Sequence, residues 1–128
     1  MKIKITLATD NGKELTKEHF GSAKNYLTYL YNLKNGNIEF LKKIKNTTPE
    51  EKTHGDSEKA KAVSKALKDS KVFVNLVFGP NISKIRKTFI PVVSRIKEIE
   101  RVLEKLKKVN KEIKENLNKD KKDIIYLN

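Results

Sequence analysis

Two histidines are the strongest candidate metal ligands in this chain, which contains no cysteine. His19 stands in the stretch Glu-His-Phe-Gly, and His54 stands in the stretch Thr-His-Gly-Asp. Neutral imidazole is a good ligand for transition metals, and the ligands of open α/β sheets gather in loops at strand ends. The lack of cysteine excludes a disulfide framework, a thiolate zinc site and a self-contained iron–sulfur site. For each histidine the alternative is an ordinary packing or hydrogen-bonding role in a loop.

Residue combinations that are typical of enzymes are missing from the sequence. A ribonuclease-H-type nuclease needs several carboxylates around two metal ions. Asp10 falls at the end of the first predicted strand, but residues 72–78 contain no acid. The chain also lacks a Ser-His-Asp order, a Walker loop and a dinucleotide-binding glycine pattern. The sequence therefore predicts a protein that is not an enzyme, in which Asp10 caps a turn.

The segments on either side of His19 predict how it is positioned. Residues 2–8 alternate polar and apolar side chains, which is typical of a strand, and Asp-Asn-Gly follows as a tight turn. Gly21 allows a sharp bend after Phe20, and Phe20 anchors the loop. We therefore expect His19 at the rim of a sheet, on the loop after the first strand and partly accessible to solvent.

The rest of the pattern predicts an α/β fold. Strands are predicted at residues 2–8, 25–33, 38–45, 72–78 and 89–93. An Asn-Gly-Asn turn predicts a hairpin between the second and third strands. A helix over residues 58–67, capped by Ser57, predicts a crossover that makes the first and fourth strands parallel neighbours. Gly79 and Pro80 lead into a short helix through residue 87, which crosses to the fifth strand.

These elements form a mixed five-stranded sheet with helices on its faces. Pro91 lies in the last predicted strand, and proline is tolerated in a strand at the edge of a sheet. Beyond it, apolar residues recur at alternating spacings of three and four, which predicts one continuous helix from about Ser94 to Leu117. These apolar residues form a seam along the helix, and Asn110 lies in it. The helix either packs wholly on the sheet or projects to pair with a second chain. The apolar residues 124–127 could dock on either.

Composition and charge narrow the function classes. A chain of 128 residues is expected to form one domain, and no segment approaches the roughly 20 apolar residues that span a bilayer. The first residues are strand-like and do not resemble a signal peptide, so we expect a cytoplasmic protein. The net charge of +13 is spread evenly, with +5 in residues 1–46, +4 in residues 47–94 and +4 in residues 95–128. Nucleic-acid modules usually concentrate such charge, although folding could gather these lysines into one patch.

The order of several residues is similar to that of a known family. Ala-Thr-Asp-Asn-Gly at residues 8–12 follows the first predicted strand, and Glu-His-Phe-Gly-Ser-Ala follows at residues 18–23. This opening resembles the dinitrogenase iron-molybdenum cofactor biosynthesis family, the small carrier and accessory domains of nitrogenase assembly and their archaeal relatives. The resemblance covers roughly residues 1–94 and implies a three-layer α/β/α domain of ribonuclease-H-like topology. Residues 95–128 then form a C-terminal helix and tail, either within the same domain or as an oligomerisation element.

The resemblance also implies a set of site residues. The implied cofactor-binding residues are His19, Gly21, His54 and Gly79, of which the two histidines are the implied metal ligands. The family usually has a glycine-rich turn before a helix, whose N–H groups would favour an anion. Here Val77 stands where the first of those glycines is expected, so a plain strand-to-helix turn is the alternative. Ser70 stands where the family has a cysteine, which removes a possible sulfur ligand.

Three functions remain as hypotheses. The resemblance implies non-catalytic binding or transient carriage of an anionic metal cofactor, an iron–sulfur or iron–molybdenum cluster or its precursor, exchanged with cluster donor or acceptor proteins. The alternative is a protein–protein interaction module without metal, acting through the C-terminal helix, with a homodimer as one form. The third is a basic nucleic-acid binder, which salt-sensitive retention on DNA or RNA would reveal.

Overall fold

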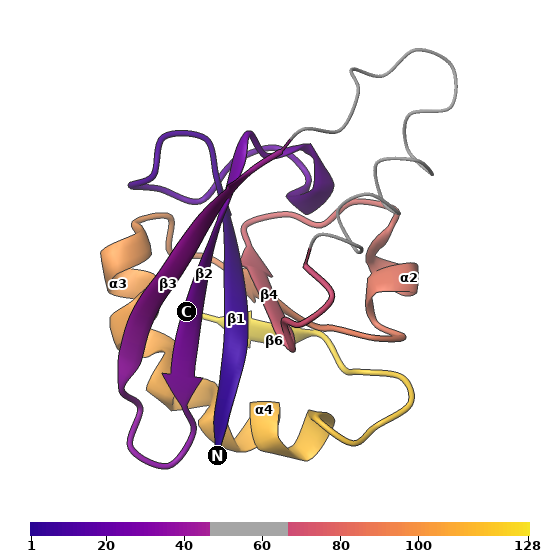
Figure 1. Cartoon of the computed structure of the whole chain (residues 1–128). Coiled ribbons are helices and arrows are strands. Elements are labelled where there is room, and N and C mark those ends of the chain that lie inside the picture. Colours follow the sequence, from indigo (N-terminus) through magenta and orange to yellow (C-terminus); the bar gives the residue numbers. More distant parts are fainter. Residues whose placement is uncertain (47–66) are drawn as a thin grey trace.

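The computed structural model describes residues 1–46 and 67–128 as one mixed sheet with helices on both of its faces (Figure 1). The strands are β1 (Lys2–Thr9), β2 (Asn25–Asn32), β3 (Ile38–Lys45), β4 (Val72–Asn75), β5 (Ile90–Ser94) and β6 (Ile125–Leu127). The helical elements are the 3₁₀ turn η1 (Phe20–Ser22), α2 (Ile82–Ile85), α3 (Ile99–Lys105), the 3₁₀ turn η2 (Leu106–Val109) and α4 (Asn110–Asn116). The predicted helix over residues 58–67 begins outside the described residues.

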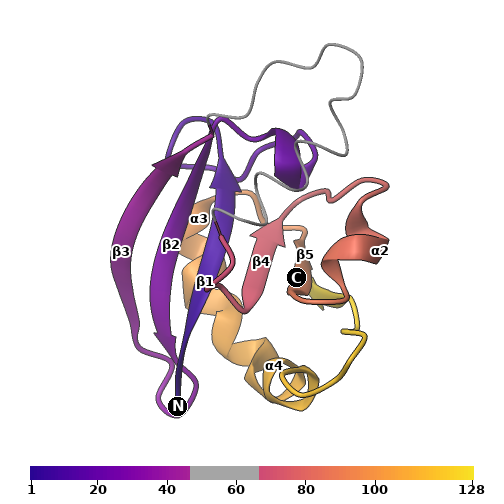
Figure 2. The same cartoon turned by 45° about the vertical axis from the view of Figure 1, so that its right-hand side comes forward.

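The sheet has six strands in the order β3-β2-β1-β4-β5-β6, and Figure 2 shows the first five side by side. The hairpin of β2 and β3 and the parallel pairing of β1 with β4 are both confirmed. The prediction of five strands is wrong, because the apolar tail forms β6 and pairs in parallel with β5. The fourth strand is also shorter than predicted, because regular pairing ends at Asn75 and the apolar residues after it leave the sheet.

Addition of β6 places Pro91 inside the sheet, not in an edge strand as predicted. The N–H of Ile90 donates to the carbonyl of Lys71, on the β4 side. Neighbouring residues of a strand direct their backbone groups to opposite sides, so the nitrogen of Pro91 faces the β6 side. Pairing with β6 begins one residue later, at Val92 opposite Ile125. The missing N–H of Pro91 therefore removes no hydrogen bond from the sheet.

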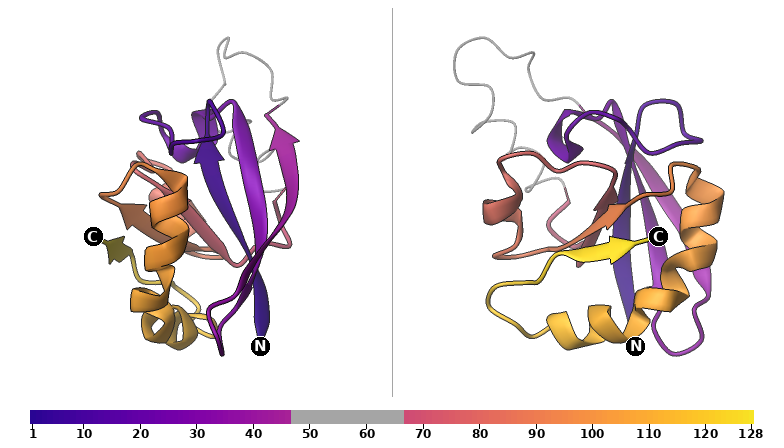
Figure 3. Two further views of the ribbon diagram at one scale, coloured as in Figure 1. Left: turned by 90° about the vertical axis from the view of Figure 1, so that its left-hand side faces the viewer. Right: turned by 180° about the vertical axis from the view of Figure 1, so that it is seen from behind.

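The two faces of the sheet bury different side chains. Alternation along β1 points Ile3, Ile5 and Leu7 to one face, where aliphatic residues of α3, η2 and α4 cover them. Figure 3 shows these helices lying along that face. The opposite face holds an aromatic cluster, against which Ile82 and Ile85 of α2 pack. We refer to these as the aliphatic face and the aromatic face; the second cluster is Ala8, Phe20, Ala23, Tyr26, Leu67, Phe73, Phe78 and Phe89.

The C-terminal helical region is shorter than predicted and is not one continuous α-helix. It begins at Ile99 and ends at Asn116, with the 3₁₀ turn η2 between α3 and α4. The residues of its apolar seam are buried on the sheet, so the region folds back over the domain. Asn110 interrupts the seam for a reason within this chain: its side chain accepts a hydrogen bond from the hydroxyl of Tyr31 and donates to the carbonyl of Leu33 at 3.3 Å.

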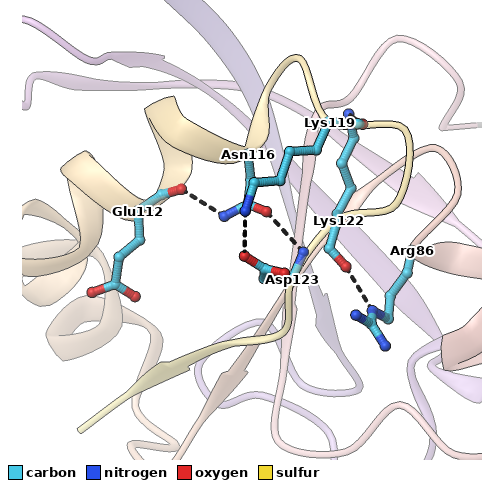
Figure 4. A network of polar contacts seen from close by, with 6 residues as sticks. All are labelled: Arg86, Glu112, Asn116, Lys119, Lys122 and Asp123. Carbon is cyan, nitrogen blue, oxygen red and sulfur yellow. Dashed lines mark hydrogen bonds and ion pairs between the residues drawn. The ribbon is translucent and has the colours of Figure 1, made fainter.

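A polar network fixes the segment that leads from α4 to β6 (Figure 4). The buried ammonium of Lys122 donates to the carbonyls of Leu117 and Lys119, which lie just beyond the end of α4. Cations are favourable at this end of a helix, where carbonyls lack partners. The carbonyl of Lys122 accepts from Nε of Arg86 at 2.6 Å, and the amide of Asp123 donates to Oδ1 of Asn116 at 2.8 Å. These contacts direct the chain onto the edge of β5.

Candidate functional site at the carboxyl ends of β1 and β4

The loop that carries His19 is closed by Asp10 at the end of β1. One carboxylate oxygen accepts from the hydroxyl of Thr16 at 2.8 Å, and the other accepts from the amide of Lys24 at 2.9 Å. The hydroxyl of Thr16 in turn accepts from the amide of Glu18 at 3.1 Å. Asp10 therefore joins the two ends of a fifteen-residue loop, as expected for a capping residue, and fixes the chain one residue before His19.

Phe20 anchors the loop in the aromatic face. Its side chain is fully buried and stacks on Phe73, with 4.4 Å between ring centroids, and on Phe78, with 5.3 Å. The hydroxyl of Tyr26 donates to the carbonyl of Phe20 at 2.9 Å. Burial, and to a lesser degree the charge of Asp10, raises the pKa of the Tyr26 hydroxyl well above its ordinary value. This hydroxyl therefore stays a donor at every physiological pH.

His19 is exposed, and its ring lies directly over Gly79. The loop and the segment after β4 meet at a parallel bridge between His19 and Val77. Gly79 has φ of +72°, a conformation that L side chains rarely adopt. A Cβ at this position would overlap Nδ1 of His19 and lie 2.6 Å from its Cγ and 2.7 Å from its Cε1. The backbone therefore favours glycine here, and a larger residue would displace the imidazole from its present position.

Asn75, the last residue of β4, contacts both the His19 loop and the segment after β4. Its side chain is fully buried, and Nδ2 donates to the carbonyl of Glu18 at 2.9 Å and to the carbonyl of Val77 at 2.9 Å. Its Oδ1 is buried and accepts no hydrogen bond within the described part of the chain. The one sequence signal of this role is a single amide in the otherwise apolar run of residues 72–78, whose apolar character alone predicts a continuous strand.

The four residues implied by the resemblance are only partly brought together. His19 and Gly79 are in contact, and Gly21 lies in η1, two residues beyond His19. Gly21 does not have a positive φ, and a Cβ there would meet no atom within 4 Å, so the local fold does not demand glycine at this position. Its carbonyl accepts from the side chain of Asn46 at 3.2 Å. His54 lies outside the described residues.

The site contains one candidate metal ligand, His19, at the edge of the sheet where β1 and β4 end. Among residues 1–46 and 67–128, no group of three or more His, Asp or Glu side chains could hold a metal ion. The loop itself is balanced in charge. Its bases are Lys13, Lys17 and Lys24, and its acids are Asp10, Glu14 and Glu18. Within the loop, His19 is therefore the candidate ligand, and the loop charges form no basic patch of their own. No helix in the described part of the chain is long and apolar enough to span a membrane.

Comparison with known proteins now gives the family. Among curated proteins, no match to this chain is found. The family described as dinitrogenase iron-molybdenum cofactor matches over residues 1–109, and thus includes β1 to β5, both sides of the His19 contact and the helices α2 and α3. The match extends beyond the region of roughly residues 1–94 in which the sequence resemblance was seen, and it ends before α4 and β6 begin. This protein belongs to the dinitrogenase iron-molybdenum cofactor family.

Proposed function

We propose that this protein binds and carries a preassembled anionic metal cluster of the iron–molybdenum or iron–sulfur type, or a precursor of one, without catalysing a reaction. The observation that carries this proposal is the exposed imidazole of His19, which rests on Gly79 where β1 and β4 end. Membership of the family supports the class of cargo. The cluster is exchanged with proteins that donate or accept it.

The donor set suits a cluster that arrives complete. A bare metal ion needs several protein ligands, and the described residues supply no group of three. A preassembled cluster brings its own sulfides and needs only an open coordination position on one metal, which one imidazole can fill. A single bond also lets the cargo leave, as carriage requires. His54 is proposed as a second ligand on the strength of the resemblance alone.

The net positive charge of the protein supports the proposal that the cargo is anionic. The net charge of +13 creates a field that attracts anions toward the whole molecule, although the His19 loop itself is neutral. Attraction of this kind speeds encounter and weakens as salt is added. Selection at the site then depends on coordination by His19.

The test is anaerobic incubation of the purified protein with isolated iron–molybdenum cofactor, followed by gel filtration and metal analysis. The wild-type protein should co-elute with iron and molybdenum, and His19→Ala should lose the metal. Lys34→Ala, an exposed residue in the turn after β2, is the matched control and should behave as wild type. Equal co-elution of wild type and His19→Ala would remove His19 as the ligand. His54→Ala measures the second ligand in the same assay.

The alternative function, protein–protein interaction through the C-terminal helix, gains no support from the fold. The apolar seam of this helix, for which packing on the sheet and pairing with a second chain were the two predictions, packs against the aliphatic face of the same chain. Asn110, which would have set the register of a two-stranded pair, is engaged by Tyr31 and Leu33.

A further inference from the structure

Asn75 is unusual among the residues of β4 because it is a buried amide at the end of a strand that is otherwise Val and Phe. Both carbonyls that it contacts belong to chain segments that leave the sheet, one before His19 and one before Gly79. An amide nitrogen carries two hydrogens, so each carbonyl receives one. The opposite orientation of the amide would place Oδ1 against both carbonyls, so these contacts fix how the side chain sits.

The two carbonyls are on either side of the His19 contact. Glu18 directly precedes His19 in the chain, and Val77 is the residue that bridges to His19 across the gap. Asn75 therefore sets the separation between the His19 loop and the segment of Val77 and Gly79. Phe20 fixes the other side of the loop through its stacking on Phe73 and Phe78, so the backbone at His19 is held from both directions.

Gly79 completes the control of the imidazole. The ring atoms nearest to its missing Cβ are Nδ1, Cγ and Cε1 of His19, which are consecutive in the ring. The near-equal distances place the face of the imidazole, at its Nδ1 side, over Gly79. A Cβ at position 79 would therefore displace the imidazole.

We propose that Asn75 is a positioning residue, which holds His19 over Gly79 through the carbonyls of Glu18 and Val77 and so presents the imidazole to the metal cargo. The part of this inference that concerns cargo rests on the proposed function. The part that concerns the ring does not, because the orientation of His19 can be measured in the protein without cargo.

A merely structural role for Asn75 makes a different prediction. If its hydrogen bonds only stabilised the end of β4, their loss would lower the free energy of unfolding and leave the imidazole of His19 unchanged in the folded protein. If Asn75 positions His19, the imidazole signals must change in folded protein, and affinity must fall beyond what the loss of stability explains. Partner groups of metal-binding histidines typically change affinity on the order of ten- to a hundredfold.

The experiment compares Asn75→Ala and Asn75→Val with Asn116→Ala. Valine suits a buried strand and keeps the fold where alanine weakens it. Asn116 is the matched control, because it is also buried and also donates to a backbone carbonyl, that of Glu112 at 2.9 Å, but lies in α4. The first readout is the ¹H–¹⁵N correlation spectrum of the imidazoles without cargo, with His19→Gln used to assign His19. The second is the affinity for isolated iron–molybdenum cofactor under anaerobic conditions.

Both Asn75 variants should shift or broaden the His19 signals and weaken cofactor binding by about tenfold or more, whereas Asn116→Ala should change neither. Unchanged His19 signals in folded Asn75→Val would overturn the inference. A change in those signals together with cofactor binding that survives His19→Ala would sustain the positioning role and reject the proposed function. The two failures are therefore distinguishable.

Discussion

The aliphatic and aromatic faces of the sheet are both well packed, but only one of them is connected to the candidate site. On the aliphatic face, Leu106 and Ile113 are fully buried and contact other side chains of the core. On the aromatic face, Phe20 is equally buried, but the next residue back is the exposed His19. A core residue beside a loop histidine fixes both stability and ligand placement. The two effects are therefore separable by choosing the face to mutate.

The largest effect is expected from Phe20→Ala. Removal of a buried phenylalanine typically lowers the free energy of unfolding by about 3–5 kcal/mol. Here it also removes the anchor of the His19 loop, which stacks on Phe73 and Phe78. We expect lower stability in urea denaturation and loss of cofactor co-elution even at a temperature where the variant is folded. Retention of wild-type co-elution would show that the anchor is not needed.

Leu106→Ala should separate stability from the site. Its side chain is fully buried on the aliphatic face, so the loss is about 2–5 kcal/mol, similar to that of Phe20→Ala. The folded fraction should bind cofactor as wild type does and should show unchanged imidazole signals for His19. Altered His19 signals in folded Leu106→Ala would mean that the two faces are coupled and that the comparison above is wrong.

Gly79→Ala and Gly12→Ala isolate the steric part of the site. Both glycines have positive φ, +72° and +81°, so alanine at either costs about 1–2 kcal/mol of backbone strain. A Cβ at Gly12 meets no atom within 4 Å, whereas a Cβ at Gly79 overlaps the ring of His19. The stability losses should therefore be comparable, but only Gly79→Ala should displace the imidazole and weaken cofactor binding. Gly21→Ala, free of both constraints, should resemble wild type.

A modest effect at neutral pH is expected for Tyr26→Phe, which removes two hydrogen bonds, one donated to the carbonyl of Phe20 and one accepted from the side chain of Asn46, each worth about 0.5–1.5 kcal/mol. The pH dependence is more informative. The pKa of Tyr26 is raised in the folded protein, whereas an unfolded tyrosine ionises near pH 10. Above about pH 10 only the unfolded state releases this proton, so the free energy of unfolding falls as pH rises. In urea denaturation between pH 8 and 11, the free energy of unfolding should fall less steeply with pH for Tyr26→Phe than for wild type.

Tyr29→Phe is the control from the aliphatic face. Burial raises the pKa of Tyr29 as well, but its side chain is less deeply buried than that of Tyr26, at 9% against 2% exposure. The flattening at alkaline pH should therefore be smaller for Tyr29→Phe. A larger flattening for Tyr29→Phe than for Tyr26→Phe would contradict the prediction that the tyrosine of the aromatic face contributes more to the pH dependence.

Much of the fold could be predicted because local patterns dominate the first half of the chain. The bounds of β3, the hairpin before it and the parallel neighbours β1 and β4 all follow from alternation, turn residues and the crossover rule. The sixth strand could not be predicted in the same way. Three residues carry too little periodicity, and the segment before them is held beside β5 by a contact between Arg86 and Lys122, 36 residues apart in the sequence. The same lack of local signal hid the break at η2.

Residues of the candidate site could be predicted only where the residue type by itself indicates a role. His19 was proposed because imidazole is a good metal ligand, and Gly79 was singled out because Gly-Pro marks a turn. Asn75 was missed because its role depends on which two carbonyls come near it. That of Val77 is two residues away, but that of Glu18 is 57 residues away in the sequence. An isolated amide in a buried strand is the signal that should have prompted the question of what it bonds.

Pro91 has a consequence for how this protein behaves at high concentration. A free sheet edge templates the addition of strands from other molecules, and proteins that remain dispersed interrupt such edges. On the β6 side, the outer strand is three residues long and Pro91 offers no N–H to extend its pairing with β5. On the other side, β3 ends in the exposed lysines 42, 43 and 45. The sheet is thus protected against aggregation by a proline and a short strand at one edge and by charge at the other, so added salt should weaken only the second protection.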